Sequence, residues 1–292
     1  MKNYRNNPQL ALDILRGKWL LHNADSFVPV ARSFIERTQT AAVPPAPLAG
    51  MAVAITGGSR ALDELAGEAP GTEKYVVVIP LRGCLTKYDN CVGTPTMEVA
   101  DLLDEYRDRE DVCAFVLDID SPGGCSNAVY PVLSAIFRIR EAGKPVIAHI
   151  DQCCSAAYWI ASGCDAIFAD NLLSEAGSIG AYYQFVDARA ANPSTGEKIV
   201  EVYAPQSVDK NKAYRDALDG DTSAAEKELS DLVDVFIKDV KAGRPDLKED
   251  TPGVLSGAVF TTPAAIDAGL VDHQADLDGC IEIAYVRAKE NQ

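Results

Sequence analysis

The stretch 145–161 constrains this chain most, because a strand pattern gives way there to small residues and then to a helix pattern. Pro145 to Ile150 is an apolar run too short for a helix and predicts a buried strand. The residues from Tyr158 to Ala161 predict the start of a helix. Between them, the sequence predicts a tight corner that holds the hydroxyl of Ser155. Backbone N–H groups at a helix start have no intrahelical partner, so they can bind an oxyanion there.

A second segment upstream supplies another source of free N–H groups. Cys113 to Asp120 reads as a buried strand, and the sequence SPGG, from Ser121 to Gly124, ends it with a turn. Successive N–H groups in such a turn can also face an anion. Two N–H sources would then flank the hydroxyl of Ser155.

The order of the remaining segments predicts an α/β fold. Strand patterns alternate with helical patterns along the chain, and this alternation implies right-handed crossovers and a largely parallel sheet. The expected strands are 75–83, 113–120, 145–150, 165–170 and 199–204, and the expected helices begin at Thr96, Ala128 and Ser223. Ser223 and Glu226 are predicted to form a capping box at the start of the last of these helices.

The N-terminal region is predicted to be separate from this domain. Residues 8–38 have apolar positions at helical spacing and predict two helices, and a proline-rich linker follows up to residue 49. We therefore expect an N-terminal helical arm with its linker at 1–49 and the main domain at 50–292. The arm suits packing on a neighbouring subunit and, equally, folding back on its own domain.

Charge and composition exclude several classes of function. The net charge of −16 argues against direct binding to nucleic acid or to an anionic membrane, because phosphate binding needs clustered Lys and Arg. No apolar run reaches 18 residues, and the N-terminus lacks a secretory cleavage pattern, so we expect a cytoplasmic protein without a membrane anchor. The eight cysteines have no metal-type spacing, which predicts buried thiols in a reducing compartment, with no metal and no cofactor. The adjacent Cys153 and Cys154 are read as packed thiols, with a reactive role as the alternative.

Three motifs together resemble a known family. They are DSPGG at 120–124, CCSAAYWIA at 153–161 and GSIG at 177–180. In this order they resemble the signal peptide peptidase A family and the related phage prohead proteases, and the resemblance extends from about Tyr75 to Ala284. It implies a Clp/crotonase-like spiral of parallel β-strands with flanking helices, and a serine peptidase activity.

The resemblance also implies roles for individual residues. Ser155 would be the nucleophile, and the backbone N–H groups of Gly124 and Ala156, with Gly123 beside them, would form the oxyanion hole. The base would be a lysine in the loop after the strand that follows GSIG. That loop offers Lys210, which we prefer, and Lys212 as second choice, although the glycine of the family's motif is missing there. Ser178 would orient the lysine, or else be an ordinary turn serine.

A Ser-His-Asp arrangement is the alternative to the Ser-Lys dyad. His149 lies six residues before Ser155 on the preceding strand and could serve as base only if the corner folded it back. A lysine fits better, because a dry pocket disfavours the ammonium and so lowers its pKa towards neutrality.

The expected function is a Ser-Lys endopeptidase. The resemblance favours a phage or prophage head-maturation protease, which cleaves scaffold or capsid proteins in the host cytoplasm or the assembling prohead as a closed homo-oligomer. One alternative is a cytosolic signal-peptide-peptidase-like protease that degrades peptides. The others are a non-catalytic assembly protein and a crotonase-type enzyme acting on acyl-CoA. The last would need an acidic residue at the corner and a basic nucleotide site, whereas this chain has a serine there and is acidic overall.

Overall fold

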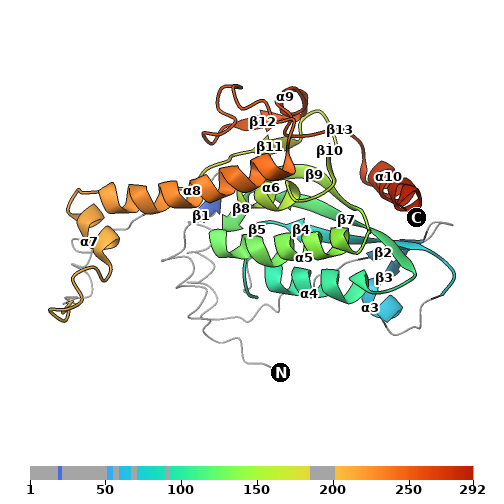
Figure 1. Ribbon diagram of the computed structural model, residues 1–292, viewed down its shortest axis with the longest axis horizontal. Coiled ribbons are helices and arrows are strands. Elements are labelled where there is room, and N and C mark those ends of the chain that lie inside the picture. The colour runs from blue at the N-terminus through green and yellow to red at the C-terminus, as the bar shows by residue number, and fades with distance from the viewer. Residues whose placement is uncertain are drawn as a thin grey trace, which may run out of the picture.

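A computed structural model describes residues 19–21, 51–54, 59–66, 71–89, 93–184 and 201–291. Within these ranges the strands form two sheets (Figure 1). The large sheet contains β2 (Met51–Ala54), β3 (Ser59–Ala61), β4 (Tyr75–Arg82), β7 (Val112–Ser121), β9 (Val146–Cys154), β10 (Ala166–Ala169), β11 (Glu175–Gly177), β12 (Val259–Thr261) and β13 (His273–Gln274). The small sheet has the order β1 (Trp19–Leu21), β8 (Gly123–Cys125), β5 (Cys84–Thr86) and β6 (Gly93–Pro95).

The centre of the large sheet is parallel. Strands β4, β7 and β9 lie side by side in parallel register, with Val78 opposite Val116 and Val116 opposite Ile147. Their near-continuous apolar runs suit a sheet that is covered on both faces. Antiparallel pairs occur only at the margins of the described sheet, where β2 pairs with β3 and β4, and β11 pairs with β12. The predicted α/β fold with a parallel sheet is confirmed.

Helices cover both faces of this sheet. The larger core lies on one face, under α4 (Thr96–Arg107), α5 (Val129–Glu141) and α6 (Ala156–Ala161). A smaller core lies on the opposite face, under α10 (Leu277–Glu290). Alternate residues of a strand point to opposite faces, so Ala148 packs in the larger core and its neighbour Ile147 in the smaller one. This alternation decides which polar residues of β9 can reach α6.

Strand β9 changes partner along its length. Residues 147–150 pair with β10, whereas residues 152–154 pair with β11. Strand β9 stays paired with β11 up to its last residue, Cys154, and the chain then turns directly into α6. Ser155 lies at this turn.

The N-terminal arm differs from the sequence prediction where it is described. Trp19–Leu21, which fall within the region 8–38 that was expected to form two helices, form strand β1 and pair with β8. An unpaired strand edge offers backbone partners that a marginal helix does not, and such tertiary pairing overrides local propensity. The rest of 8–38, and the linker up to residue 49, lie outside the described residues.

A long helix projects from the domain in Figure 1. It is α8 (Ser223–Gly243), and the short α7 (Lys212–Leu218) lies against its far end. The predicted capping box of Ser223 and Glu226 does not form: Thr222 is the N-cap residue and its side chain caps no backbone N–H, while its Oγ1 donates a hydrogen bond to the Glu226 carboxylate. No strand forms over residues 201–204, where the sequence predicted the end of one. The described helices include none with the length and apolarity that a bilayer crossing requires.

Candidate active site

Ser155 occupies a strained corner between β9 and α6. Its backbone has φ 57° and ψ −119°, a region that residues other than glycine rarely adopt. The Ser155 N–H donates to the carbonyl of Gly177 at 2.8 Å, and the Ser155 carbonyl accepts the N–H of Trp159 at 2.9 Å. A serine held on a sharp strand-to-helix turn is the arrangement that presents a nucleophilic hydroxyl in many hydrolases.

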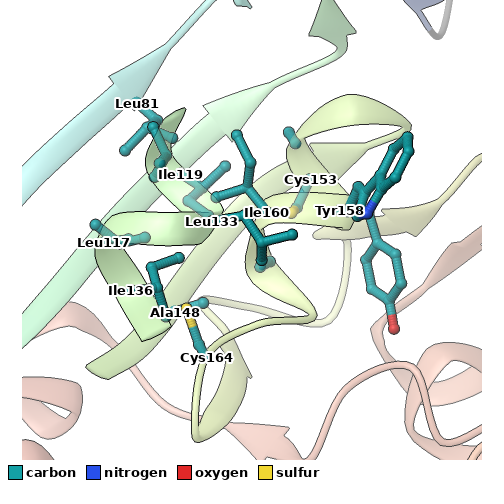
Figure 2. Packing of buried hydrophobic residues seen from close by; sticks show 14 of the residues in the cluster. Leu81, Leu117, Ile119, Leu133, Ile136, Ala148, Cys153, Tyr158, Ile160 and Cys164 are labelled. Atoms are coloured by element: carbon teal, nitrogen blue, oxygen red, sulfur yellow. The ribbon is translucent and has the colours of Figure 1, made fainter. Parts of the chain in front are cut away.

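Packing around α6 holds this corner in place. The indole N–H of Trp159 donates to Asp239 of α8 at 3.0 Å, and its ring stacks on Phe236 with centroids 4.5 Å apart. Tyr158 donates its hydroxyl to the carbonyl of Leu270 at 2.9 Å. Figure 2 shows Tyr158 and Ile160 among the buried residues of the larger core. Because every residue of α6 is buried, the backbone of the corner has little freedom to relax.

Strand β8 contacts α6 and carries the glycines predicted for the oxyanion hole. A Cβ on Gly124 would lie 2.0 Å from the carbonyl oxygen of Leu85, so only glycine fits at that position. The N–H of Gly123 donates to Ser121 Oγ at 3.1 Å, and Ser121 Oγ donates to the carbonyl of Gly83 at 2.6 Å. Since the N–H of Gly123 is engaged, Gly124 and Ala156 are the better placed of the predicted donors.

Ser121 has a role at the site that was not predicted from the sequence. Its hydroxyl ties Gly83, the residue between β4 and β5, to the turn that leads into β8, and so positions the glycines. The signal was present in the sequence, because a serine directly before a Pro-Gly-Gly turn commonly bonds to the backbone of that turn. We class Ser121 as a positioning residue.

Ser178 follows directly on the residue that anchors Ser155. Gly177 has φ 114° and Ser178 has φ 54°, so both adopt backbone conformations that favour glycine. The N–H of Ser178 donates to the carbonyl of Ala258 at 2.7 Å, and this bond fixes the turn. The structure therefore brings Ser155, Ser178 and the β8 glycines to one region of the fold.

The two candidate lysines lie elsewhere. Lys210 and Lys212 are exposed, beside or at the start of α7, and Figure 1 places α7 at the end of α8 that projects away from α6. Lys212 forms an ion pair with Asp216, and this hydrogen-bonded partner raises the pKa of Lys212 above its usual range. Within the described part of the chain, no lysine amine is hydrogen-bonded to Ser155 or Ser178.

His149 points to the opposite face of the sheet from α6. Its Nδ1 lies 2.8 Å from Asp118 Oδ1 and its Nε2 lies 3.2 Å from Asp170 Oδ1, while Arg82 also pairs with Asp118. Both ring nitrogens are engaged on the α10 side, so His149 does not act as the base for Ser155. This geometry removes the Ser-His-Asp alternative.

The His149 cluster predicts a pH-dependent contribution to stability. Burial lowers the pKa of His149, but its hydrogen bonds to Asp118 and Asp170 offset this, and the net shift is upward. A raised native pKa stabilises the fold fully below the unfolded value of about 6.5, and the stabilisation is lost as pH rises through the native pKa. We expect His149→Ala to cost about 1–3 kcal/mol of unfolding free energy at pH 5.5 and less at pH 9, measured by urea denaturation. A cost that does not change with pH would contradict this assignment, and peptidase activity should survive in the folded variant.

The adjacent thiols of Cys153 and Cys154, at the end of β9, are not suited to act as nucleophiles. Burial raises the pKa of Cys153, and burial raises that of Cys154 to about 12. A thiol with a raised pKa stays protonated near neutral pH and is a poor nucleophile. Among the described residues, no cluster of three His, Cys, Asp or Glu side chains is arranged to hold a metal ion.

A strained, buried serine at a strand-to-helix corner of a parallel α/β sheet, faced by a glycine strand, is an arrangement by which hydrolases present a nucleophilic serine. The sequence model of Peptidase family S49 matches residues 138–290, which include this corner. The chain belongs to peptidase family S49.

Curated relatives carry protease and phage-assembly names. The head-tail preconnector protein of Enterobacteria phage P21 is 28% identical over 209 residues, which cover 71% of this chain and 39% of that protein. Protease 4 of Haemophilus influenzae is 26% identical over 206 residues, which cover 66% of this chain and 31% of that protein. The chloroplastic serine protease SPPA of Arabidopsis thaliana is 26% identical, covering 75% of this chain and 33% of that protein. The chain thus spans well under half the length of these relatives.

Solved structures that match include both proteases and crotonase-type enzymes. A membrane-bound stomatin-specific protease aligns with a TM-score of 0.35 and 19% identity, over 70% of this chain and 80% of that one. An enoyl-CoA hydratase from Shewanella pealeana aligns with a TM-score of 0.44 and 11% identity, over 77% of this chain and 76% of that one. These likenesses are distant, and no assignment of function rests on them.

Proposed function

We propose that this protein is a serine endopeptidase in which Ser155 is the nucleophile. The observation that carries the proposal is the strained backbone of Ser155 on a strand-to-helix turn beside the glycine strand β8. Ser155 Oγ would attack the scissile carbonyl and lose its proton to a base. The N–H groups of Gly124 and Ala156 would hold the resulting oxyanion. The base would then protonate the leaving amine, and water would hydrolyse the acyl-enzyme with the same base assisting.

We further propose that the base is Lys210 of a neighbouring copy. Lys210 lies two residues before α7, and Figure 1 places α7 at the end of α8 that projects away from α6. A dyad with Ser155 would therefore use the α7–α8 segment of a second subunit. Lys210 is preferred to Lys212, because the pairing with Asp216 keeps Lys212 charged and a lysine accepts a proton only when it is neutral. Ser178 would orient the lysine once it enters the site.

Exposed apolar side chains support assembly into a homo-oligomer. They lie on α7 and α8 and in the segment just before α7, and they are Val202, Val208, Tyr214 and Val235. Exposed apolar patches of this kind mark interfaces, and identical subunits usually close with rotational symmetry. Light scattering is expected to give a mass that is a multiple of 31.2 kDa. A monodisperse 31.2 kDa species with full activity would contradict both the oligomer and the shared dyad.

Complementation tests the origin of the base. Ser155→Ala and Lys210→Ala chains should each be inactive alone. When the two are co-expressed, sites that combine one copy's serine with another copy's lysine should restore roughly a quarter of wild-type activity, by random mixing around a closed ring. Casein hydrolysis by the purified mixture provides the measurement.

Lys212→Ala is the matched control, since Lys212 lies two residues away and is equally exposed. We expect Lys212→Ala to retain activity. Loss of activity in Lys212→Ala together with retention in Lys210→Ala would reverse the choice of lysine. If the co-expressed Ser155→Ala and Lys210→Ala chains are as inactive as each chain alone, Lys210 does not complete the active site of a neighbouring subunit.

The names of the relatives suggest a substrate class. One relative is a phage head-tail preconnector protein, so we propose scaffold or capsid proteins as substrates, in the host cytoplasm or the assembling prohead. The relatives named Protease 4 and SPPA support a more general peptide-degrading protease as the alternative.

One observation favours a second candidate, a non-catalytic assembly protein: among the described residues, no lysine of the same chain is hydrogen-bonded to Ser155. If the wild-type chain and the Ser155→Ala chain show the same lack of casein cleavage, and the mixture gains none, the results would support that candidate.

A further inference from the structure

The outer edge of β8 is paired with a segment of the chain's own N-terminal region. Strand β1 runs antiparallel to β8, with Trp19, Leu20 and Leu21 opposite Cys125, Gly124 and Gly123. The other edge of β8 pairs with β5, where Leu85 lies opposite Gly124. Within the described residues, β1 is the terminal strand of this sheet. It therefore covers an edge that would otherwise present unpaired backbone groups.

This edge lies beside the candidate active site. Gly124, the predicted oxyanion donor, is the residue that Leu20 faces across the two strands. Strand β8 also contacts α6, which begins directly after Ser155. An extended peptide binds a free strand edge through backbone hydrogen bonds and adds one strand to the sheet. A peptide added to β8 would run next to Ser155, in the place that β1 holds.

We propose that Trp19–Leu21 occupy the strand position of an extended peptide substrate, so that the N-terminal segment competes with substrate from within the chain. The inference rests on the proposed function, because it takes β8 as the strand that receives the substrate backbone. It adds to that function a built-in competitor, which is displaced when a peptide of higher affinity binds.

The size of β1 fits a competitor that can be displaced. Over the residues that the structure describes, its pairing with β8 covers three positions, Trp19–Leu21, and so supplies few backbone hydrogen bonds. Residues 22–50 separate Leu21 from the next strand at Met51, so the segment is tethered to its own site. A segment linked covalently to its own site competes at an effective concentration on the order of mM, which suffices to weaken the binding of a free peptide that uses the same edge.

Proline substitutions in the full chain test this proposal. Leu20→Pro and Leu21→Pro are made separately, in a Ser155→Ala background, because neighbouring residues of a strand direct their N–H groups alternately towards and away from the partner. The probe is a labelled peptide of residues 15–26, followed by fluorescence anisotropy. At least one proline variant is expected to bind the probe about tenfold more tightly than its parent, because the internal competitor is weakened.

Two controls make the outcome specific. Thr40→Pro lies in the same N-terminal region but outside β1, and it should leave probe affinity unchanged. A probe that carries proline at the positions of Leu20 and Leu21 should bind more weakly to every chain. Equal probe affinity in the parent, Leu20→Pro and Leu21→Pro chains, with all three folded by thermal melting, would overturn the proposal.

Hydrolysis separates this inference from the proposed function. In chains that keep Ser155, the proline variant that tightens probe binding should raise kcat/KM for a peptide substrate by a similar factor. If no chain hydrolyses any peptide but the proline variant still binds the probe more tightly, the peptidase assignment fails and the occupancy of β8 by β1 stands.

Discussion

Ser155→Ala is expected to lower peptide hydrolysis by about four orders of magnitude or more, because the remaining site can only bind and polarise the scissile bond. The fold should be unaffected. Alanine keeps the Cβ that the φ 57° corner already accommodates, so the free energy of unfolding should change by less than about 1 kcal/mol. Casein cleavage and urea denaturation, measured on the same preparation, provide the two readouts.

A serine outside the corner gives the matched control. Ser230→Ala changes an exposed serine on α8 and should leave both hydrolysis and stability unchanged. Wild-type rates in purified Ser155→Ala protein would contradict the role of Ser155 as nucleophile. A loss of activity that accompanies unfolding would show instead that the hydroxyl matters to the corner itself.

Gly124→Ala is expected to damage both the site and the fold. The added Cβ would lie 2.0 Å from the backbone oxygen of Leu85, so β8 and β5 must separate. This displacement moves the N–H of residue 124 away from the oxyanion position, and the loss of one such donor costs about 100-fold or more in kcat. Overpacking against backbone costs about 1–3 kcal/mol of stability. Steady-state kinetics and thermal melting of the purified variant measure the two effects.

Gly71→Ala is the control for the glycine substitution. A Cβ at Gly71 meets only the backbone nitrogen of Glu73, at 4.0 Å, and the position lies in no described helix or strand. Activity and melting temperature should stay at wild-type values. Wild-type kcat in Gly124→Ala, with the protein folded, would mean that β8 does not supply the oxyanion donor.

The sequence predicted the elements that depend on local pattern. The apolar run before Ser155 and the small residues around it specified the corner between β9 and α6, because a buried strand and a helix start each have a local signature. Helix α5 likewise begins within one residue of its predicted start at Ala128, since the pattern that starts a helix is local.

Long-range pairing could not be predicted in this way. Trp19–Leu21 form a strand only because β8 offers an edge about one hundred residues further along the chain. The Ser121 hydroxyl that engages the Gly123 N–H is itself held by the carbonyl of Gly83, which lies between β4 and β5, about 40 residues earlier in the chain. The position of α7, next to which Lys210 lies, follows from the direction of α8, which no local pattern specifies.

Covalent labelling of the active site tests the central claim most directly. Wild-type protein is treated with a fluorophosphonate probe, digested and mapped by mass spectrometry. We expect a single adduct on the peptide that contains Ser155, formed in parallel with loss of casein hydrolysis and absent from the Ser155→Ala protein. An adduct on a different residue, or full inactivation with Ser155 unmodified, would contradict the assignment of Ser155 as the nucleophile.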